Sequence, residues 1–215
     1  MQTHAWGIAP NMVPLNDYHQ TTPIIPCQGI VFLEYLFYTV CMNTDIELKT
    51  GNWLLVMGPR KIVPTLLTMT ARLAEAGPVR VVDGGNLYNV YPVARAARGR
   101  TEVLERISVS RAFSCYQVLN LLESMPAESV PFVVLDLLRT FYDQSVWAAE
   151  RKRLLRKCLT HLDRLEKTAG GLVSVHPPRV LCQTESELLE MVQAAARDTY
   201  HVQMAAPAPV PMRLF

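Results

Sequence analysis

The chain has 215 residues, of which 50% are hydrophobic and 19% are charged, and 21 Lys and Arg against 19 Asp and Glu give a formal net charge of +2. This composition excludes a chain that is disordered along its whole length, and the length suits one domain with tails. A net charge so near zero points to neither nucleic acid nor membrane as a partner, so any basic site must be local.

The cysteines and the apolar runs indicate the compartment. The most apolar run, residues 30–42, is shorter than the roughly 20 residues that span a bilayer, and the first residues lack the charged and apolar regions of a signal peptide. We expect a cytoplasmic protein with no membrane segment. Five widely spaced cysteines without a C-x-x-C pair predict reduced core thiols rather than disulfides or a metal site: Cys27, Cys41, Cys115, Cys158 and Cys182.

The chain divides into an arm, a domain and a tail. Residues 1–28 contain four prolines and one charge, which predicts an irregular N-terminal arm. Residues 29–204 are expected to form the folded domain, and residues 205–215 a proline-containing tail. Within the domain, residues 30–42 predict a buried helix, although their aromatic and β-branched content leaves a strand possible.

From residue 53 onward, short apolar runs alternate with helical patterns. The runs predict strands over residues 53–57, 79–83, 106–112, 131–136 and 171–175, with a final strand or loop at 179–182. Helices are predicted over residues 64–76, 91–98, 114–124, 148–168 and 185–197, the last with Thr184 as its cap and Glu187 completing a capping box. Strands buried on both faces and separated by helices specify an α/β fold with a parallel sheet covered on both sides.

Ligands of an open parallel sheet bind beyond the carboxyl ends of its strands. The residues expected at that edge are those that follow each predicted strand: 58–65, Asp83 to Asn86, Ser110 with Arg111, Asp136 and His176.

Five segments between about Gly51 and Val180 carry a family resemblance: LLVMGPRKIVPT (54–65), VRVVDGG (79–85), ISVSRAFSCYQVLNLLE (107–123), PFVVLD (131–136) and GGLVSVHPP (170–178). In this order and at near-family spacing, they resemble the RecA/RadA recombinase superfamily, with the first segment at the phosphate loop and PFVVLD at the Walker B strand. The resemblance implies a RecA-like parallel-sheet sandwich with helices on both faces.

The phosphate loop departs from the family pattern. A working loop reads G-x-x-x-x-G-K-[ST], in which glycines let backbone amides wrap the phosphates and the lysine reaches the β- and γ-phosphates. Gly58 and Thr65 keep the first and last positions, but Val63 replaces the second glycine and Pro64 replaces the lysine. Lys61 lies three positions too early to substitute simply.

The catalytic carboxylate is missing as well. After its second strand the family carries a Glu that orients the attacking water, and this chain has Gly85 there. Asp136 remains and is able in principle to hold a metal-bound water. We therefore expect no catalytic residue and only a vestigial nucleotide site of Gly58, Lys61, Thr65 and Asp136. Binding of ATP with Mg²⁺ but without hydrolysis is the intermediate alternative.

Two segments are candidates for DNA binding. Residues 151–167 hold seven basic and two acidic side chains, and Arg151, Lys152, Arg153, Arg156 and Lys157 are predicted to bind phosphates, although a solvated helix face would have the same pattern. Charge reversal across 151–157 is then expected to lower DNA affinity with thermal stability nearly unchanged. In the second segment, Arg139, Phe141 and Tyr142 suit contacts with unpaired bases, or else they pack under a loop.

The residues and the resemblance together predict a non-catalytic accessory protein of DNA recombination or repair. It would bind DNA, preferably single-stranded, and an active RecA-like subunit or a repair polymerase. The alternatives are an NTPase that uses Lys61 and Asp136 in a rearranged phosphate loop, and a scaffold that binds neither DNA nor nucleotide and pairs through residues 30–42.

The C-terminal residues Met212, Leu214 and Phe215 also resemble peptides that dock on the bacterial sliding clamp. Pro211 stands where that family has Gln, and a tail folded back on its own domain is the alternative.

Overall fold

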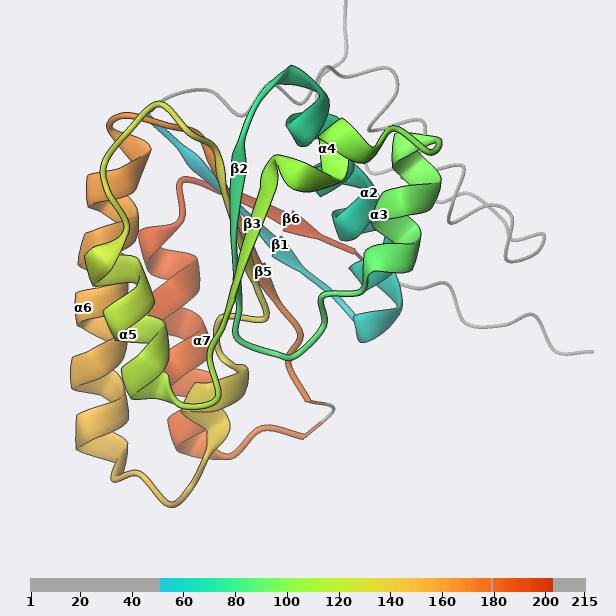
Figure 1. Ribbon diagram of the computed structural model, residues 1–215. Coiled ribbons are helices and arrows are strands. Elements are labelled where there is room, and N and C mark those ends of the chain that lie inside the picture. The colour runs from blue at the N-terminus through green and yellow to red at the C-terminus, as the bar shows by residue number, and fades with distance from the viewer. Residues whose placement is uncertain (1–50, 179, 203–215) are drawn as a thin grey trace, which may run out of the picture.

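Six parallel strands form one sheet in the order β3-β2-β4-β5-β1-β6 (Figure 1). The computed structural model describes residues 51–178 and 180–202. The strands are β1 (Trp53–Met57), β2 (Val79–Asp83), β3 (Ile107–Arg111), β4 (Phe132–Leu135), β5 (Gly171–Val175) and β6 (Asp198–His201). The helices are α2 (Val63–Ala76), α3 (Val90–Ala97), α4 (Thr101–Glu105), α5 (Cys115–Ser124), α6 (Ala148–Glu166) and α7 (Gln183–Ala195), with short 3₁₀ turns η1 (Arg60–Ile62) and η2 (Arg139–Tyr142).

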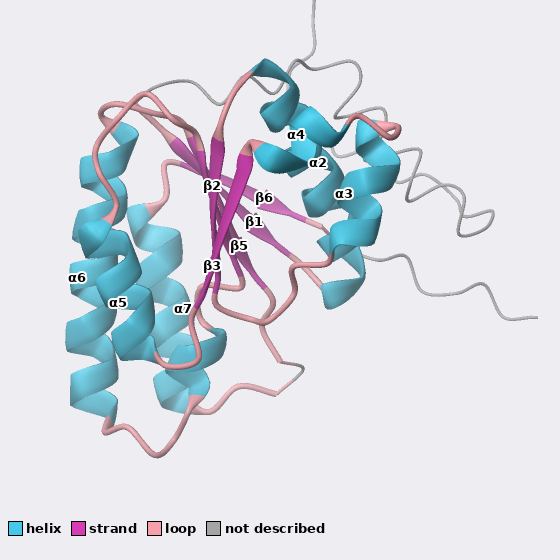
Figure 2. Cartoon of the chain, in the orientation of Figure 1, coloured by secondary structure: helices cyan, strands magenta, loops and turns pink. Residues whose placement is uncertain are grey.

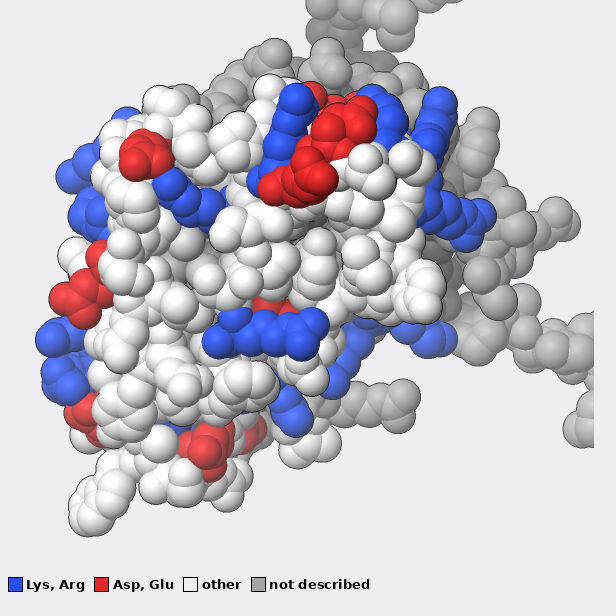
Figure 3. Space-filling view, in the orientation of Figure 1, with Lys and Arg blue, Asp and Glu red and all other residues white. Residues whose placement is uncertain are grey.

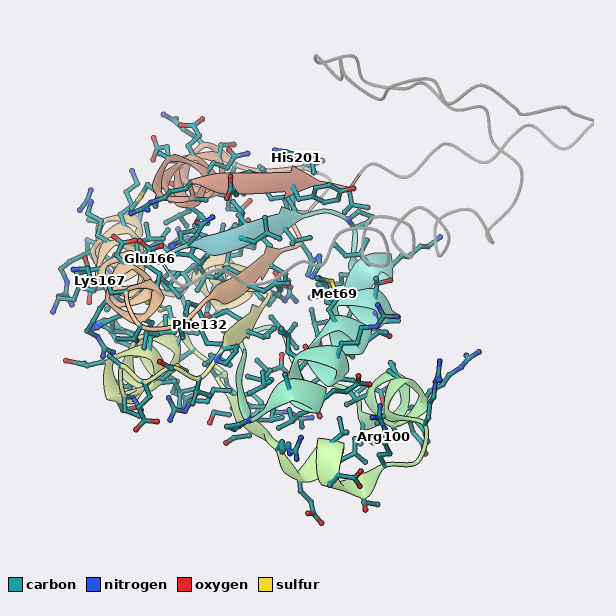
Figure 4. All side chains as sticks on the ribbon, turned by 90° about the horizontal axis from the view of Figure 1, so that it is seen from above. Met69, Arg100, Phe132, Glu166, Lys167 and His201 are labelled. Carbon is teal, nitrogen blue, oxygen red and sulfur yellow. The ribbon has the colours of Figure 1, made fainter. Side chains whose placement is uncertain are left out.

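The parallel sheet with helices on both sides confirms the predicted α/β fold. Helices α2, α3 and α4 cover one face and α5, α6 and α7 cover the other (Figure 2). Successive strand residues serve opposite layers: on β1, Leu55 packs under α5–α7 and Val56 packs under α2–α4. Seen from above, Glu166 lies on the α6 side of the sheet and Met69 on the α2 side (Figure 4).

The path of the chain explains which helix covers which face. From β1 the chain crosses over α2 to β2 and then β3, moving toward one edge of the sheet. It returns through β4 and β5 and finishes at β6 beyond β1. Crossovers between parallel strands are right-handed, so helices of the outward path and helices of the return path lie on opposite faces.

The last part of the domain was predicted least well. Of the two alternatives for 179–182, a strand or a loop, the described residues 180–182 form a loop, and the sixth strand is β6, which the sequence argument did not predict. Helix α7 begins at Gln183 with Cys182 as its N-cap, and Glu185 rather than Glu187 accepts the amide of the cap residue at 3.0 Å. Cys115 and Cys158 are buried free thiols as predicted, whereas the free thiol of Cys182 is exposed rather than in the core.

Several predictions fall outside the described residues: the arm at 1–28, the segment 30–42, the tail at 205–215 and its peptide of Met212, Leu214 and Phe215. Within residues 51–178 and 180–202, no helix has the length and apolar character needed to cross a membrane.

Close packing between β4 and β5 requires a glycine. A Cβ atom on Gly171 would lie 2.1 Å from Cζ of Phe132, a core side chain that is 1% exposed. We expect Gly171→Ala to lower the free energy of unfolding by about 3 kcal/mol, since overpacking forces the ring and both strands apart. Urea denaturation measures the change.

Gly77→Ala is the matched control, because a Cβ there meets nothing within 4 Å and its φ of 172° is ordinary extended backbone. Equal stability of the two variants would contradict the packing of β4 on β5.

Candidate functional site

Asp136 is the centre of the carboxyl edge, the edge of the sheet at which the strands end. It follows β4, is fully buried and has a φ of +52°, a left-handed conformation that Asp and Asn adopt more readily than other non-glycine residues. Its amide donates to Oγ of Ser174 on β5 at 2.9 Å, and its Oδ1 accepts from the amide of His176 at 3.2 Å. Asp136 therefore joins the ends of β4 and β5.

His176 extends this link to β1. The ring Nδ1 lies 2.9 Å from the carbonyl oxygen of Gly58, which only accepts, so Nδ1 carries the proton. The Nε2 atom is buried and has no hydrogen-bond partner among the described residues. The predicted site residues Gly58 and Asp136 are thus brought together through His176.

The segment after β1 forms no phosphate-binding loop. Three of its amides, at Gly58, Ile62 and Val63, donate to carbonyl oxygens, and Pro59 and Pro64 have no amide hydrogen. The 3₁₀ turn η1 begins two residues after Gly58 and leads directly into α2.

The space above Gly58 is also occupied. A Cβ atom there would lie 3.0 Å from Cβ of Val202 and 3.2 Å from Cδ1 of Ile62. Lys61 is exposed and Thr65 lies in the first turn of α2, and no hydrogen bond or ion pair between described residues joins either side chain to Asp136. The four predicted nucleotide-site residues therefore do not converge on a single binding site.

The turn after β2 packs against Asp136 through two glycines, Gly84 and Gly85. A Cβ atom on Gly85 would lie 2.6 Å from Cβ of Asp136, so the position of the family's catalytic Glu has no room for any side chain. Asp83 is buried and accepts the amides of Leu87 and Tyr88, each at 2.9 Å. Its carboxylate shapes this turn rather than facing a ligand.

A pocket opens where the chain leaves neighbouring strands toward opposite faces. Strand β2 leads to α3 on one side, while its neighbours β3 and β4 lead to α5 and α6 on the other. In open α/β sheets such a switch point is where ligands bind. The carboxyl-edge pocket has a volume of about 430 Å³ and is lined by the loops after these three strands, residues 84–86, 112–113, 139–140 and 142–143.

Exposed cations surround the pocket and continue along the carboxyl edge. Arg139 lines the pocket, Arg111 ends β3, and Arg60 and Lys61 follow β1. Figure 3 shows Lys and Arg atoms across the lower part of this face, where the strands of Figure 1 end. Arg111 is 3.6 Å from the buried carboxylate of Asp83, and Arg60 is 3.5 Å from that of Asp136, yet about half of each guanidinium side chain faces solvent.

The basic helix differs from its sequence-based prediction. Arg151 is 5% exposed and donates to the carbonyl oxygen of Phe141 at 3.1 Å, so it does not belong to a phosphate-binding surface. Lys152 pairs with Glu187 on α7, and Arg153 makes two 2.7 Å hydrogen bonds to Glu150.

Only Arg156 and Lys157 of the predicted set on α6 are exposed cations without an ion pair in the described ranges. Most of the predicted phosphate-binding side chains on α6 therefore bond to other groups of the protein itself.

In the loop after β4, too, some predicted contact residues are exposed and others are buried. Arg139 is exposed as predicted, but Phe141 is fully buried under α5 and α6 and cannot stack on a base. Tyr142 is half-buried, and burial together with the nearby carboxylates of Asp136 and Glu185 raises its pKa. Phe113, which the sequence argument missed as a contact residue, is the exposed aromatic of the pocket at 74%. Its position directly before the Ser114 cap of α5 was the available signal.

In comparisons with known proteins, no protein-family model and no curated protein matches the sequence. The resemblance to the recombinase superfamily therefore stays a prediction.

Burial raises the pKa of Asp136, although His176, Arg60 and Arg139 favour its ionised form. A raised folded-state pKa means that ionisation costs stability, and this cost appears as the pH rises from the unfolded value near 3.8 through the folded value. Asp136→Asn keeps an acceptor for His176 and the left-handed backbone but cannot ionise.

We expect the stability of Asp136→Asn relative to the wild type to increase over that pH window, as measured by urea denaturation from pH 4 to 8. If the stability of Asp136→Asn relative to the wild type instead falls as the pH rises, the neighbouring cations stabilise the ionised carboxylate more than burial destabilises it. That result would contradict the raised pKa.

The burial of Arg151 changes the expected result of charge reversal on α6. Arg151→Glu places an unpaired carboxylate beside the carbonyl of Phe141 and should lower the free energy of unfolding by about 3 kcal/mol. Arg156→Glu, on the same helix but exposed, should change it by less than about 0.5 kcal/mol. Thermal unfolding of both variants checks this, and a stable Arg151→Glu protein would contradict the described burial.

Proposed function

We propose that this protein is a non-catalytic accessory protein of DNA recombination or repair that binds single-stranded DNA along the carboxyl edge of its sheet. The observation that carries the proposal is an exposed aromatic, Phe113, in a pocket with Arg139, two residues beyond Arg111. Proteins that bind single strands combine a positively charged path for the backbone with aromatic rings on which bases stack.

The charges of the edge support a path for the phosphate backbone. Arg60 and Lys61 lie in η1, Arg111 ends β3 and Arg139 begins η2, and all four are exposed. Their alignment with the strand ends follows from the parallel sheet, which brings every carboxyl end to the same edge. On α6, by contrast, three of the five predicted basic contacts are buried or paired.

The hydrogen-bonded backbone amides after β1 support an accessory role rather than ATP hydrolysis. Donors that would wrap phosphates are used internally at Gly58, Ile62 and Val63, and Gly85 leaves no place for a water-orienting carboxylate. The resemblance to the RecA/RadA superfamily supports a partner of that class, or a repair polymerase, as the active subunit.

The test is fluorescence anisotropy of labelled single-stranded DNA over a salt series, with and without ATP. Lys61→Glu/Arg139→Glu changes the carboxyl edge, and Arg156→Glu/Lys157→Glu changes the free face of α6 by the same total charge. We expect the wild type to bind without ATP, and the edge variant to bind more weakly and to lose about 1 to 2 units of salt slope, since each phosphate contact releases counterions.

The α6 variant is expected to keep the slope of the wild type. A larger loss in the α6 variant would place the interface on the helix instead. Binding only with ATP would favour the rearranged NTPase, and no binding by the wild type would favour the scaffold.

A further inference from the structure

The carboxyl-edge pocket has the size and the boundary of a small-ligand site. Its volume of about 430 Å³ falls within the range of roughly 300–1,000 Å³ that is usual for such sites. Three loops that are far apart in the sequence line it, and each follows a strand of the same hydrogen-bonded sheet. The pocket is therefore part of the packed domain rather than a feature of one surface loop.

The aromatic residue of the pocket is exposed, and hydrogen bonds hold its backbone. Phe113 is 74% exposed, although its amide donates to Oε1 of Gln117 at 2.7 Å and the next residue, Ser114, caps α5. These contacts hold the backbone of Phe113 at the start of a helix. A large ring held at a pocket and left in water is a surface on which another flat ring can stack.

Two side chains that line the pocket carry polar atoms without partners. Thr140 Oγ1 and Tyr142 Oη are both buried, and neither has a hydrogen-bond partner in the described part of the chain. Buried polar groups in native proteins are nearly always hydrogen-bonded, so each unpaired one requires an explanation. Asn86, exposed and in the left-handed region with a φ of 53°, adds an amide donor and acceptor to the same lining.

The charges of the lining favour a neutral ligand. Arg139 contributes one positive charge and Asp143 one negative charge. The carboxylate of Asp143 accepts the amide of Ser145 at 2.9 Å, and this hydrogen bond lowers the pKa of Asp143, so it is ionised at neutral pH. A phosphate group would meet this exposed carboxylate inside the pocket, whereas Arg111, Arg60 and Lys61 lie outside the lining.

We infer that the carboxyl-edge pocket seats one nucleobase turned out of the bound strand, stacked on Phe113, with its polar edge toward Thr140, Tyr142 and Asn86. The inference rests on the proposed function and adds to it: the protein recognises bases as well as phosphates. Phosphates on either side of the seated base lie along the cations of the carboxyl edge.

The experiment compares a labelled oligonucleotide with an abasic deoxyribose-phosphate chain of equal length, which has the same charge and no bases. The wild type should bind the oligonucleotide more tightly. Phe113→Ala should lower that affinity about 10-fold, as expected for one lost base–aromatic stack, and leave binding of the abasic chain unchanged. Trp147→Ala is the matched control, because Trp147 is 83% exposed and does not line the pocket, so both affinities should stay at wild-type values.

Tyr142→Phe removes only the unpaired hydroxyl. We expect weaker binding of the oligonucleotide, unchanged binding of the abasic chain and no fall in the unfolding temperature of the free protein, since the hydroxyl has no partner there. A fall in unfolding temperature would show that the hydroxyl serves the fold and would overturn its role in the pocket.

The outcomes separate this inference from the proposed function. Equal affinity of the wild type for both chains overturns the base pocket and leaves DNA binding in place. No binding of either chain overturns both. If free dAMP binds and Phe113→Ala weakens that binding but not binding of the oligonucleotide, the pocket serves a free nucleotide and the inference is wrong.

Discussion

The hydrogen bonds around Asp136 hold the carboxyl edge of this protein together. Oδ1 of Asp136 accepts the amide of His176, whose ring reaches the carbonyl of Gly58, so one buried carboxylate connects the ends of β4, β5 and β1. The turn after β2 joins the same cluster, because Gly84 donates to the carbonyl of Leu135 and Gly85 packs on the side chain of Asp136. The loops that form the candidate site are held by this cluster, and their spacing depends on it.

This arrangement gives the two switch points of the sheet different properties. Between β1 and β5, the space is filled by His176, Ile62 and Val202, and the amides of Gly58, Ile62 and Val63 are bonded within the protein. Between β2 and its neighbours β3 and β4, Gly84 and Gly85 pack on Asp136, and a pocket with an exposed aromatic and a guanidinium lies beside them. A fold that binds ligands at its strand ends thus has one closed and one open crevice, and the proposed DNA contact lies at the open one.

Sequence patterns were sufficient for the elements whose burial is uniform. The strands β1, β2, β4 and β5 are short, mainly apolar and largely buried runs, and the long helix α6 has an apolar stripe at helical spacing, so each was predicted at nearly its observed bounds. Strand β6 was missed because Asp-Thr-Tyr-His at the edge of the sheet is largely exposed and has no apolar pattern. Helix α4, with five residues, is too short to show a period.

The candidate site was predictable in position but not in detail. Val63 and Pro64 depart from the phosphate-loop pattern, and after β1 the chain forms the turn η1 and enters α2. Whether a loop aromatic is buried depends on the elements packed around it, so the sequence could not distinguish the buried Phe141 from the exposed Phe113. The same holds for Arg151, which lies at a basic position of the helix but points toward the carbonyl of Phe141.

The central claim is that single-stranded DNA lies along the carboxyl edge, over the segments after β1, β2, β3 and β4. Hydrogen–deuterium exchange of the full chain with and without an unlabelled oligonucleotide tests it directly, because each loop is followed separately. The account predicts slower exchange in residues 58–65, 84–88, 111–114 and 137–145 when the oligonucleotide is added, with α6 unchanged. Slower exchange confined to the exposed face of α6, or slower exchange at 58–65 on addition of ATP alone, would contradict it.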